Sequence, residues 1–168
     1  MVGCRLASPR VAWHSETRVS MSQESKYHRL ESGTVRRPQL ILHVEDDAET
    51  RRLYGIFLVR AGFEVVEAVN GREALELAPH VAPDLILMDL AMPEMDGMEA
   101  TRRLKADERT RHIPIVAFTA HGYRAHLREA SAAGCDGFIV KPCSGAVLIR
   151  TVLELLETRE MMQKAASQ

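Results

Sequence analysis

The sequence has few cysteines, few aromatic residues and no long apolar run. Cys4, Cys135 and Cys143 make an odd number without paired Cys-x-x-Cys spacing, which argues against a disulfide framework or a structural zinc site and favours a cytoplasmic protein. The longest apolar runs are the length of a strand, so we expect no transmembrane helix, and the N-terminus lacks the apolar core of a secretory signal. Trp13, the only tryptophan, and the methionines indicate no cofactor site.

Residues 1–38 differ in composition from the rest of the chain. They contain seven Lys and Arg against three acidic residues, a net charge of +4, with many Ser and Thr and no persistent periodicity. We interpret them as a mostly disordered basic leader. A basic segment can contact nucleic acid or a membrane surface, but interleaved aromatic residues and a basic repeat are missing, so we expect neither partner. Alternatively, Met21 is the natural start.

From Gln39 onwards, apolar runs alternate with segments of helical periodicity. The expected strands are 40–44, 63–69, 85–89, 113–118 and 138–140, and the expected helices are 48–61, 72–78, 98–106, 121–133 and 145 to about 160. In the first helix, the spacing predicts core positions at Leu53, Phe57, Leu58 and Ala61. Five strand–helix units with short links predict one α/β domain over residues 39–160, a doubly wound parallel sheet with helices on both faces.

Four of these strands end on polar groups that packing alone would not select. They are Glu45-Asp46, Asp89, Thr119 and Lys141. The carboxyl ends of the strands share one edge of a doubly wound sheet, so these side chains are expected to converge. Asp89 follows the most apolar strand, which we expect at the centre of the sheet.

The expected cluster holds three carboxylates, a hydroxyl and an ammonium. Crowded carboxylates raise one another's pKa unless a cation lies between them. Oxygen ligands without His or Cys suit a hard ion, and a shallow site at loop ends suits Mg²⁺. A carboxylate beside Mg²⁺ and a lysine can attack phosphorus, because both cations neutralise charge on the phosphoryl oxygens. The cluster therefore predicts an aspartyl-phosphate site.

The motifs around these residues resemble the receiver domain of two-component response regulators. They are Glu45-Asp46, LILMDLAMPEMDG, PIVAFTA and GFIVKP, in matching order and spacing over about 39–157. The chain is similar to stand-alone CheY-like or DivK-like regulators and to receivers of hybrid histidine kinases. The resemblance implies a flavodoxin-like strand order 2-1-3-4-5, a histidine kinase or histidine phosphotransfer protein as phosphoryl donor, and a downstream protein target, with a homodimer possible.

The resemblance also implies the residues that hold Mg²⁺. Asp89 is the expected phospho-acceptor. Asp46 is expected to bind the metal directly and Glu45 through a water, and the carbonyl of Ala91 completes the site. Ala91 also offers no side chain to orient a hydrolytic water, so we expect a long-lived phosphate.

Further roles follow from the same resemblance. Asp89, Thr119 and Lys141 are the expected catalytic residues, and Thr119 and Phe138 correspond to the switch pair of the family. Phosphorylation is expected to change the surface formed by the fourth helix, fifth strand and fifth helix. His121, two residues after Thr119, departs from the polar groups found in members that hydrolyse their phosphate quickly.

Surplus apolar positions indicate two docking surfaces. Ile56 and Val59 share a face of the first helix beside the acidic pair, where a histidine-bearing hairpin is expected to bind, although isolated exposed apolar residues are also common without a function. On the last helix, Ile149 and Leu153 are the expected surplus, where a partner or a second copy docks.

Each polar residue taken alone has an ordinary explanation, such as a helix cap or a solvated lysine, so the prediction depends on their combination. A phosphohydrolase would need a second acid where Ala91 stands. A receiver-like adaptor that binds partners without phosphate turnover remains the alternative. We expect that the protein is not an enzyme in the usual sense. It would catalyse only its own phosphorylation and its slow dephosphorylation.

The expected domain is acidic, unlike the leader. Residues 39–160 carry 14 Lys and Arg against 20 acidic residues, a net charge of −6, which disfavours direct nucleic-acid binding. Residues 161–168 are expected to be a short tail without an output domain. The seven histidines lack metal-ligand spacing and are expected mostly on the surface or in the leader, and Cys143 is expected to be a small apolar filler.

Overall fold

The computed structural model describes residues 28–29, 35–120 and 124–166. Two short strands, β1 (His28–Arg29) and β2 (Val35–Arg36), pair antiparallel. The main sheet contains β3 (Leu40–Val44), β4 (Glu64–Ala68), β5 (Leu85–Met88), β6 (Ile115–Thr119) and β7 (Gly137–Val140). The helices are α1 (Ala48–Arg60), α2 (Gly71–Val81), α3 (Gly97–Ala106), α4 (Arg124–Ala133) and α5 (Gly145–Ala166).

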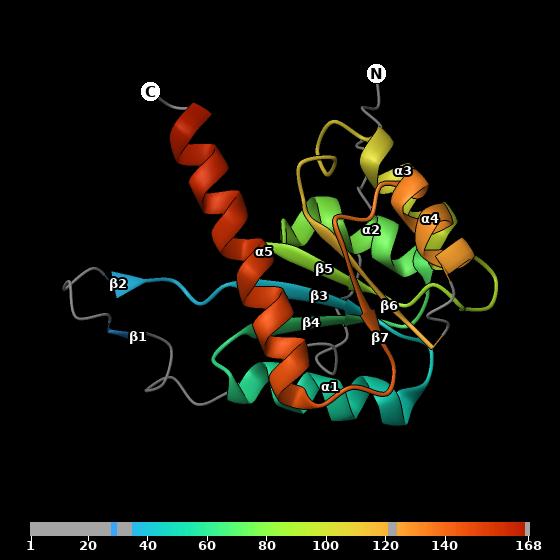
Figure 1. Ribbon diagram of the computed structural model, residues 1–168, viewed down its shortest axis with the longest axis horizontal. Coiled ribbons are helices and arrows are strands. Elements are labelled where there is room, and N and C mark those ends of the chain that lie inside the picture. Colours follow the sequence, from blue (N-terminus) through green and yellow to red (C-terminus); the bar gives the residue numbers. More distant parts are fainter. Residues whose placement is uncertain (1–27, 30–34, 121–123, 167–168) are drawn as a thin grey trace, which may run out of the picture.

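The main sheet is parallel throughout and has the order β4-β3-β5-β6-β7. Counted along the main sheet alone, this is the predicted order 2-1-3-4-5, and the predicted doubly wound α/β fold is confirmed. Helices α1 and α5 lie on one face of the sheet, and α2, α3 and α4 lie on the other (Figure 1).

Burial explains why the sequences of β5, and of β6 up to Phe118, are unbroken apolar runs. Every residue of both strands is buried, because each strand has helices over both of its faces. Alternate residues of β5 enter opposite cores: Ile86 and Met88 pack with α2, α3 and α4, whereas Leu85 and Leu87 pack with α1 and α5. The central strand is therefore held rigidly up to the residue at its carboxyl end.

Side-chain caps fix where three of the helices begin. Asp47, Asn70 and Asp96 each accept a hydrogen bond from a backbone N–H three residues further on, at 2.8, 2.9 and 2.7 Å. Asp47 thereby caps the first helix. Helix α2 begins directly after Asn70 and runs to Val81, so it is longer than the predicted 72–78.

The predicted core positions of α1 were only partly right. Leu53 is 49% exposed and Ala61 is exposed, whereas Tyr54 and Gly55 are buried with Leu58. The cause is a tertiary contact, because the Tyr54 hydroxyl accepts from the N–H of Cys143 at 3.2 Å and so draws this side of the helix inward. Leu58 is buried and Phe57 packs against the core, as predicted.

The last helix is longer than expected, and one histidine is buried. Helix α5 continues to Ala166, beyond the predicted end near Glu160. Most of residues 1–38 lie outside the described residues, so the disordered leader stays a prediction. His43 is fully buried in β3, an exception to the mostly surface or leader positions expected of the histidines. Within the described residues, no helix is long and apolar enough to cross a membrane.

Candidate functional site

The backbone of the sheet fixes the positions of the polar residues at its carboxyl edge. Glu45, Asp89 and Lys141 each follow the last residue of a strand, yet their N–H groups still donate to a neighbouring strand. The acceptors are the carbonyls of Ala68, Val44 and Thr119, at 3.0, 2.9 and 2.8 Å respectively. These side chains therefore start from the rigid part of the fold rather than from free loops.

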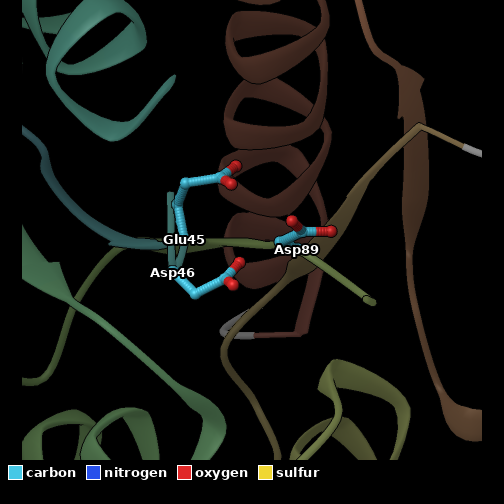
Figure 2. A group of neighbouring side chains, drawn as sticks. All are labelled: Glu45, Asp46 and Asp89. Carbon is cyan, nitrogen blue, oxygen red and sulfur yellow. The ribbon is translucent and has the colours of Figure 1, made fainter. Parts of the chain in front are cut away.

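Three carboxylates meet at this edge, as the sequence predicted. Glu45, Asp46 and Asp89 each offer a carboxylate oxygen, and these oxygens lie within 4.8 Å of one another. Figure 2 shows Glu45 and Asp46 side by side, with their carboxyl groups on the side of Asp89. Glu45 is 1% exposed and Asp89 4%, whereas Asp46 is exposed to solvent. Two buried carboxylates and one solvated carboxylate are therefore clustered at this edge of the sheet.

Lys141 connects the two buried acids. Its ammonium donates to Glu45 Oε2 at 2.7 Å and to Asp89 Oδ2 at 2.8 Å. Burial lowers the pKa of Lys141, but the hydrogen bonds to both carboxylates outweigh burial and hold that pKa above its ordinary value. Lys141 is therefore a permanent cation in the site.

One ammonium does not balance three carboxylates. Burial raises the pKa of Glu45 to about 7; the hydrogen bond from Lys141 opposes that rise, and the charge of Asp89 adds to it. Acids crowded in this way favour a further cation, and an all-oxygen donor set with one solvated carboxylate suits Mg²⁺. The residues present therefore fit a hard divalent ion.

The loop after Asp89 holds its carboxylate from the other side. The N–H of Ala91 donates to Asp89 Oδ1 at 3.1 Å, so the two carboxylate oxygens have different partners. The loop closes tightly, because a Cβ at Gly97 would collide with the backbone carbonyl of Asp89. This contact explains the glycine after Asp96, the cap of α3.

The predicted switch residues lie on neighbouring strands. Thr119 is buried at the end of β6, between the strands that carry Asp89 and Lys141. Phe138 in β7 is half-buried and packs against the core beneath α2, α3 and α4. The peptide bond between Lys141 and Pro142 is cis. His121 lies outside the described residues.

The predicted docking residues divide into exposed and core positions. Ile56 is 42% exposed and Leu153 is also exposed. Val59 and Ile149 pack against the core between the sheet, α1 and α5, so their expected exposure was wrong. The exposed apolar neighbour of Ile56 is Leu53, three residues before it.

Sequence reasoning missed four residues on the α1 side of the site. Arg51 donates to the backbone of the acidic pair and contacts Glu67 of β4, and Tyr54 holds the segment after Lys141. His43 lies in the core close to the Phe118 ring. The helical spacing of Arg51, Tyr54 and Leu58 is the signal that would have placed Arg51 and Tyr54 on the inner side of α1.

A family model matches most of the described chain. The model of the response regulator receiver domain matches residues 41–153. The chain therefore belongs to the family of response regulator receiver domains. Proteins of this family act in two-component signalling, interact with histidine kinases and downstream targets, and bind Mg²⁺ at their acidic site; they are generally not enzymes in the usual sense.

Individual proteins agree with this assignment. The chain is 38% identical to the polar-differentiation response regulator DivK of Brucella anthropi over 119 residues, 71% of this chain and 97% of that protein. It is similar to the chemotaxis protein CheY4 of Vibrio cholerae, with 31% identity and a TM-score of 0.67 over 70% of this chain and 98% of that one. It also resembles the receiver domain of a sensor histidine kinase from Pseudomonas aeruginosa, which has a magnesium ion coordinated in its active-site cleft; identity is 32% and the TM-score 0.68, over 71% and 98% of the two chains.

Proposed function

We propose that this protein is a single-domain response regulator that accepts a phosphoryl group on Asp89 from a phosphohistidine. The observation that carries the proposal is the contact of Lys141 with both Asp89 and Glu45, beside the solvated carboxylate of Asp46. A nucleophilic carboxylate, a fixed ammonium and an oxygen-rich cation site are the parts that phosphoryl transfer to an aspartate needs. The donor would be a histidine kinase or a histidine phosphotransfer protein.

In this reaction Asp89 is the nucleophile. One of its oxygens forms a bond to phosphorus as the bond from phosphorus to the donor imidazole breaks. The Ala91 N–H and the Lys141 ammonium hold the carboxylate at 3.1 and 2.8 Å, so it is oriented before the donor arrives. Lys141 then remains beside the new phosphoryl group and neutralises part of its charge.

The metal would be held by Asp46 and Asp89, with Glu45 acting through a water and the Ala91 carbonyl completing the set. Bound Mg²⁺ would neutralise charge on the phosphoryl oxygens during transfer. The solvated position of Asp46 suits an ion that keeps several of its waters. Glu45, at the back of the site, keeps Lys141 directed toward Asp89.

The signal would leave through the surface formed by α4, β7 and α5. A phosphoryl group on Asp89 offers an acceptor to the Thr119 hydroxyl, which would move inward and leave space for Phe138. Phe138 is half-buried and lacks the hydroxyl of a tyrosine, so its two positions would differ in packing alone. On α5, Leu153 is one of the exposed apolar residues, and it is the one that we expect a downstream partner or a second copy to contact.

The donor would dock on α1. Leu53 and Ile56 are exposed, apolar and three residues apart, on the helix that begins beside the acidic pair. A histidine-bearing hairpin laid on this pair would bring its phosphate toward Asp89. Two free cysteines, Cys135 and Cys143, fit the cytoplasmic location that we propose for this exchange.

The test is labelling by acetyl phosphate, which needs no docking partner. Wild-type protein incubated with acetyl phosphate and Mg²⁺ should gain one phosphoryl group in its intact mass, and the same protein with EDTA should not. Asp89→Asn, which keeps the shape of the side chain, should gain none. Wild type that remains unmodified at saturating donor and Mg²⁺ would favour the adaptor that binds partners without phosphate turnover.

A further inference from the structure

Arg51 ties the first turns of α1 to the acidic pair. Its Nη1 donates to the backbone carbonyl of Glu45 at 2.7 Å and to that of Asp46 at 3.2 Å. The Arg51 side chain is only 15% exposed; its bond to Glu45 is partly buried, whereas its bond to Asp46 lies at the surface. One guanidinium therefore holds two successive peptide groups, those that carry the side chains directed at the metal site.

A second contact fixes the guanidinium itself. Arg51 Nε lies 3.4 Å from Glu67 Oε2, and Glu67 stands on β4 opposite His43 of β3. Gly55, one turn after Arg51, leaves room for this carboxylate, because a Cβ there would lie 3.2 Å from Glu67 Oε1. The position of Arg51 is thus set by an acid on a neighbouring strand.

The peptide groups held by Arg51 are where the sheet gives way to the helix. The Glu45 N–H still belongs to the sheet, since it donates to Ala68 O at 3.0 Å, and Asp47 already caps α1. Asp46 is the link between these two elements. Fixing the carbonyls on either side of its Cα restricts the direction of its side chain, and that side chain is the solvated carboxylate of the site.

We propose that Arg51, anchored by Glu67, is a positioning residue for the Mg²⁺ site. This inference rests on the proposed function, and Arg51 acts only through Glu45 and Asp46. Outer residues that orient ligands are typically worth about 10- to 100-fold in metal affinity. The sign of the effect is diagnostic: loss of a nearby positive charge would by Coulomb's law strengthen cation binding, whereas loss of a positioning residue weakens it.

The experiment is calorimetric titration of the full chain with MgCl₂. Arg51→Met should bind Mg²⁺ about 10-fold more weakly or worse. Arg51→Lys keeps the charge but loses the planar fork, and should lie between wild type and Arg51→Met. Arg52→Met is the matched control: it removes the same charge from the next, exposed position and should bind at least as tightly as wild type.

A second readout separates positioning from chemistry. In Arg51→Met, half-maximal labelling of Asp89 by acetyl phosphate should need more Mg²⁺, while the rate at saturating Mg²⁺ approaches that of wild type. Thermal unfolding in EDTA shows whether each variant is folded; if Arg51→Met is not, Arg51→Lys decides the matter. Wild-type or tighter Mg²⁺ affinity in the folded variant overturns the inference. Absence of Mg²⁺ binding by wild type would instead count against the proposed function.

Discussion

The ammonium of Lys141 lies 2.8 Å from Asp89 Oδ2, and the two side chains are 13% and 6% exposed. They directly follow β7 and β5 and are 52 residues apart in the sequence. A charged pair so well shielded from water depends on both partners, because either charge alone would be costly to bury. The consequences for stability and for labelling can be measured separately.

Lys141→Met should reduce both the stability and the reactivity of the site. It leaves Glu45 and Asp89 buried without their cation, and we expect the free energy of unfolding in EDTA to fall by about 3 kcal/mol. Mg²⁺ should restore more stability to Lys141→Met than to wild type, because no ammonium competes with the metal. Urea unfolding with and without Mg²⁺ measures both effects. Stability equal to wild type in EDTA would show that the pair contributes little.

Thr119→Ala should separate phosphorylation from the structural response. The variant retains Asp89 and Lys141, so acetyl phosphate should still label it. Without the hydroxyl, the amide NMR signals of α4, β7 and α5 should shift much less on labelling than they do in wild type. Shifts as large as those of wild type would mean that the signal takes a path independent of Thr119.

Ala91→Asn should shorten the lifetime of the phosphate. Residue 91 is exposed, and its N–H already contacts Asp89, so an amide side chain there can reach a water near the phosphoryl group. We expect decay to accelerate about tenfold, below the usual contribution of a positioned acid or base. The loss of label is followed by intact mass after the acetyl phosphate is removed. An unchanged decay rate would mean that residue 91 does not limit hydrolysis.

Leu53→Asp and Ile56→Asp should block transfer from the kinase without affecting acetyl phosphate. A charge on the exposed face of α1 disrupts an apolar contact but leaves the reacting groups in place. Leu153→Asp on α5 is the matched control, exposed and apolar but on the other helix, and should accept phosphate normally. Val59→Asp should destabilise the fold, because Val59 packs against the core. If Ile56→Asp reduces phosphorylation by the kinase and by acetyl phosphate equally, the substitution has caused a folding defect.

His43→Leu should make stability less sensitive to acid. Burial, with the charges of Lys141 and Arg51, lowers the pKa of His43 to about 3, and neither ring nitrogen has a hydrogen-bond partner within the described part of the chain. From about pH 6.5 down to about pH 3 the unfolded state therefore binds a proton that the folded state does not, and stability falls with pH. Melting temperatures between about pH 7 and about pH 5 should fall less in His43→Leu than in wild type. If the melting temperatures of His43→Leu and wild type fall equally between these pH values, protonation of His43 does not cause the loss of stability.

The sheet and the acidic site could be predicted because their signals are local. A strand buried on both faces leaves an unbroken apolar run, and the polar residue after it stands out, as Asp89 does after Met88. Parallel topology then brings such residues to one edge without any knowledge of loop structure. Glu45, Asp46 and Lys141 were placed correctly by this reasoning.

The rotation of α1 and the surroundings of His43 could not be predicted in the same way. Tyr54 is buried because its hydroxyl meets the backbone of Cys143, 89 residues later. Arg51 lies half-buried on the same side of the helix because it reaches the carbonyl of Glu45. Leu53, the more apolar residue between them, is exposed as a result. The periodicity of a sequence does not reveal such individual long-range contacts. In a weakly amphipathic helix, these contacts decide which side faces the core, so only the tertiary structure shows it.

Mapping the modified residue shows whether Asp89 is the phospho-acceptor. Wild-type protein labelled with acetyl phosphate and Mg²⁺ is reduced with borohydride, which converts an aspartyl phosphate to homoserine, and the peptides are sequenced by mass spectrometry. We expect homoserine at position 89 alone, and no conversion in Asp89→Asn or in EDTA. Modification at Glu45 or Asp46, or persistence of the label in Asp89→Asn, would contradict it.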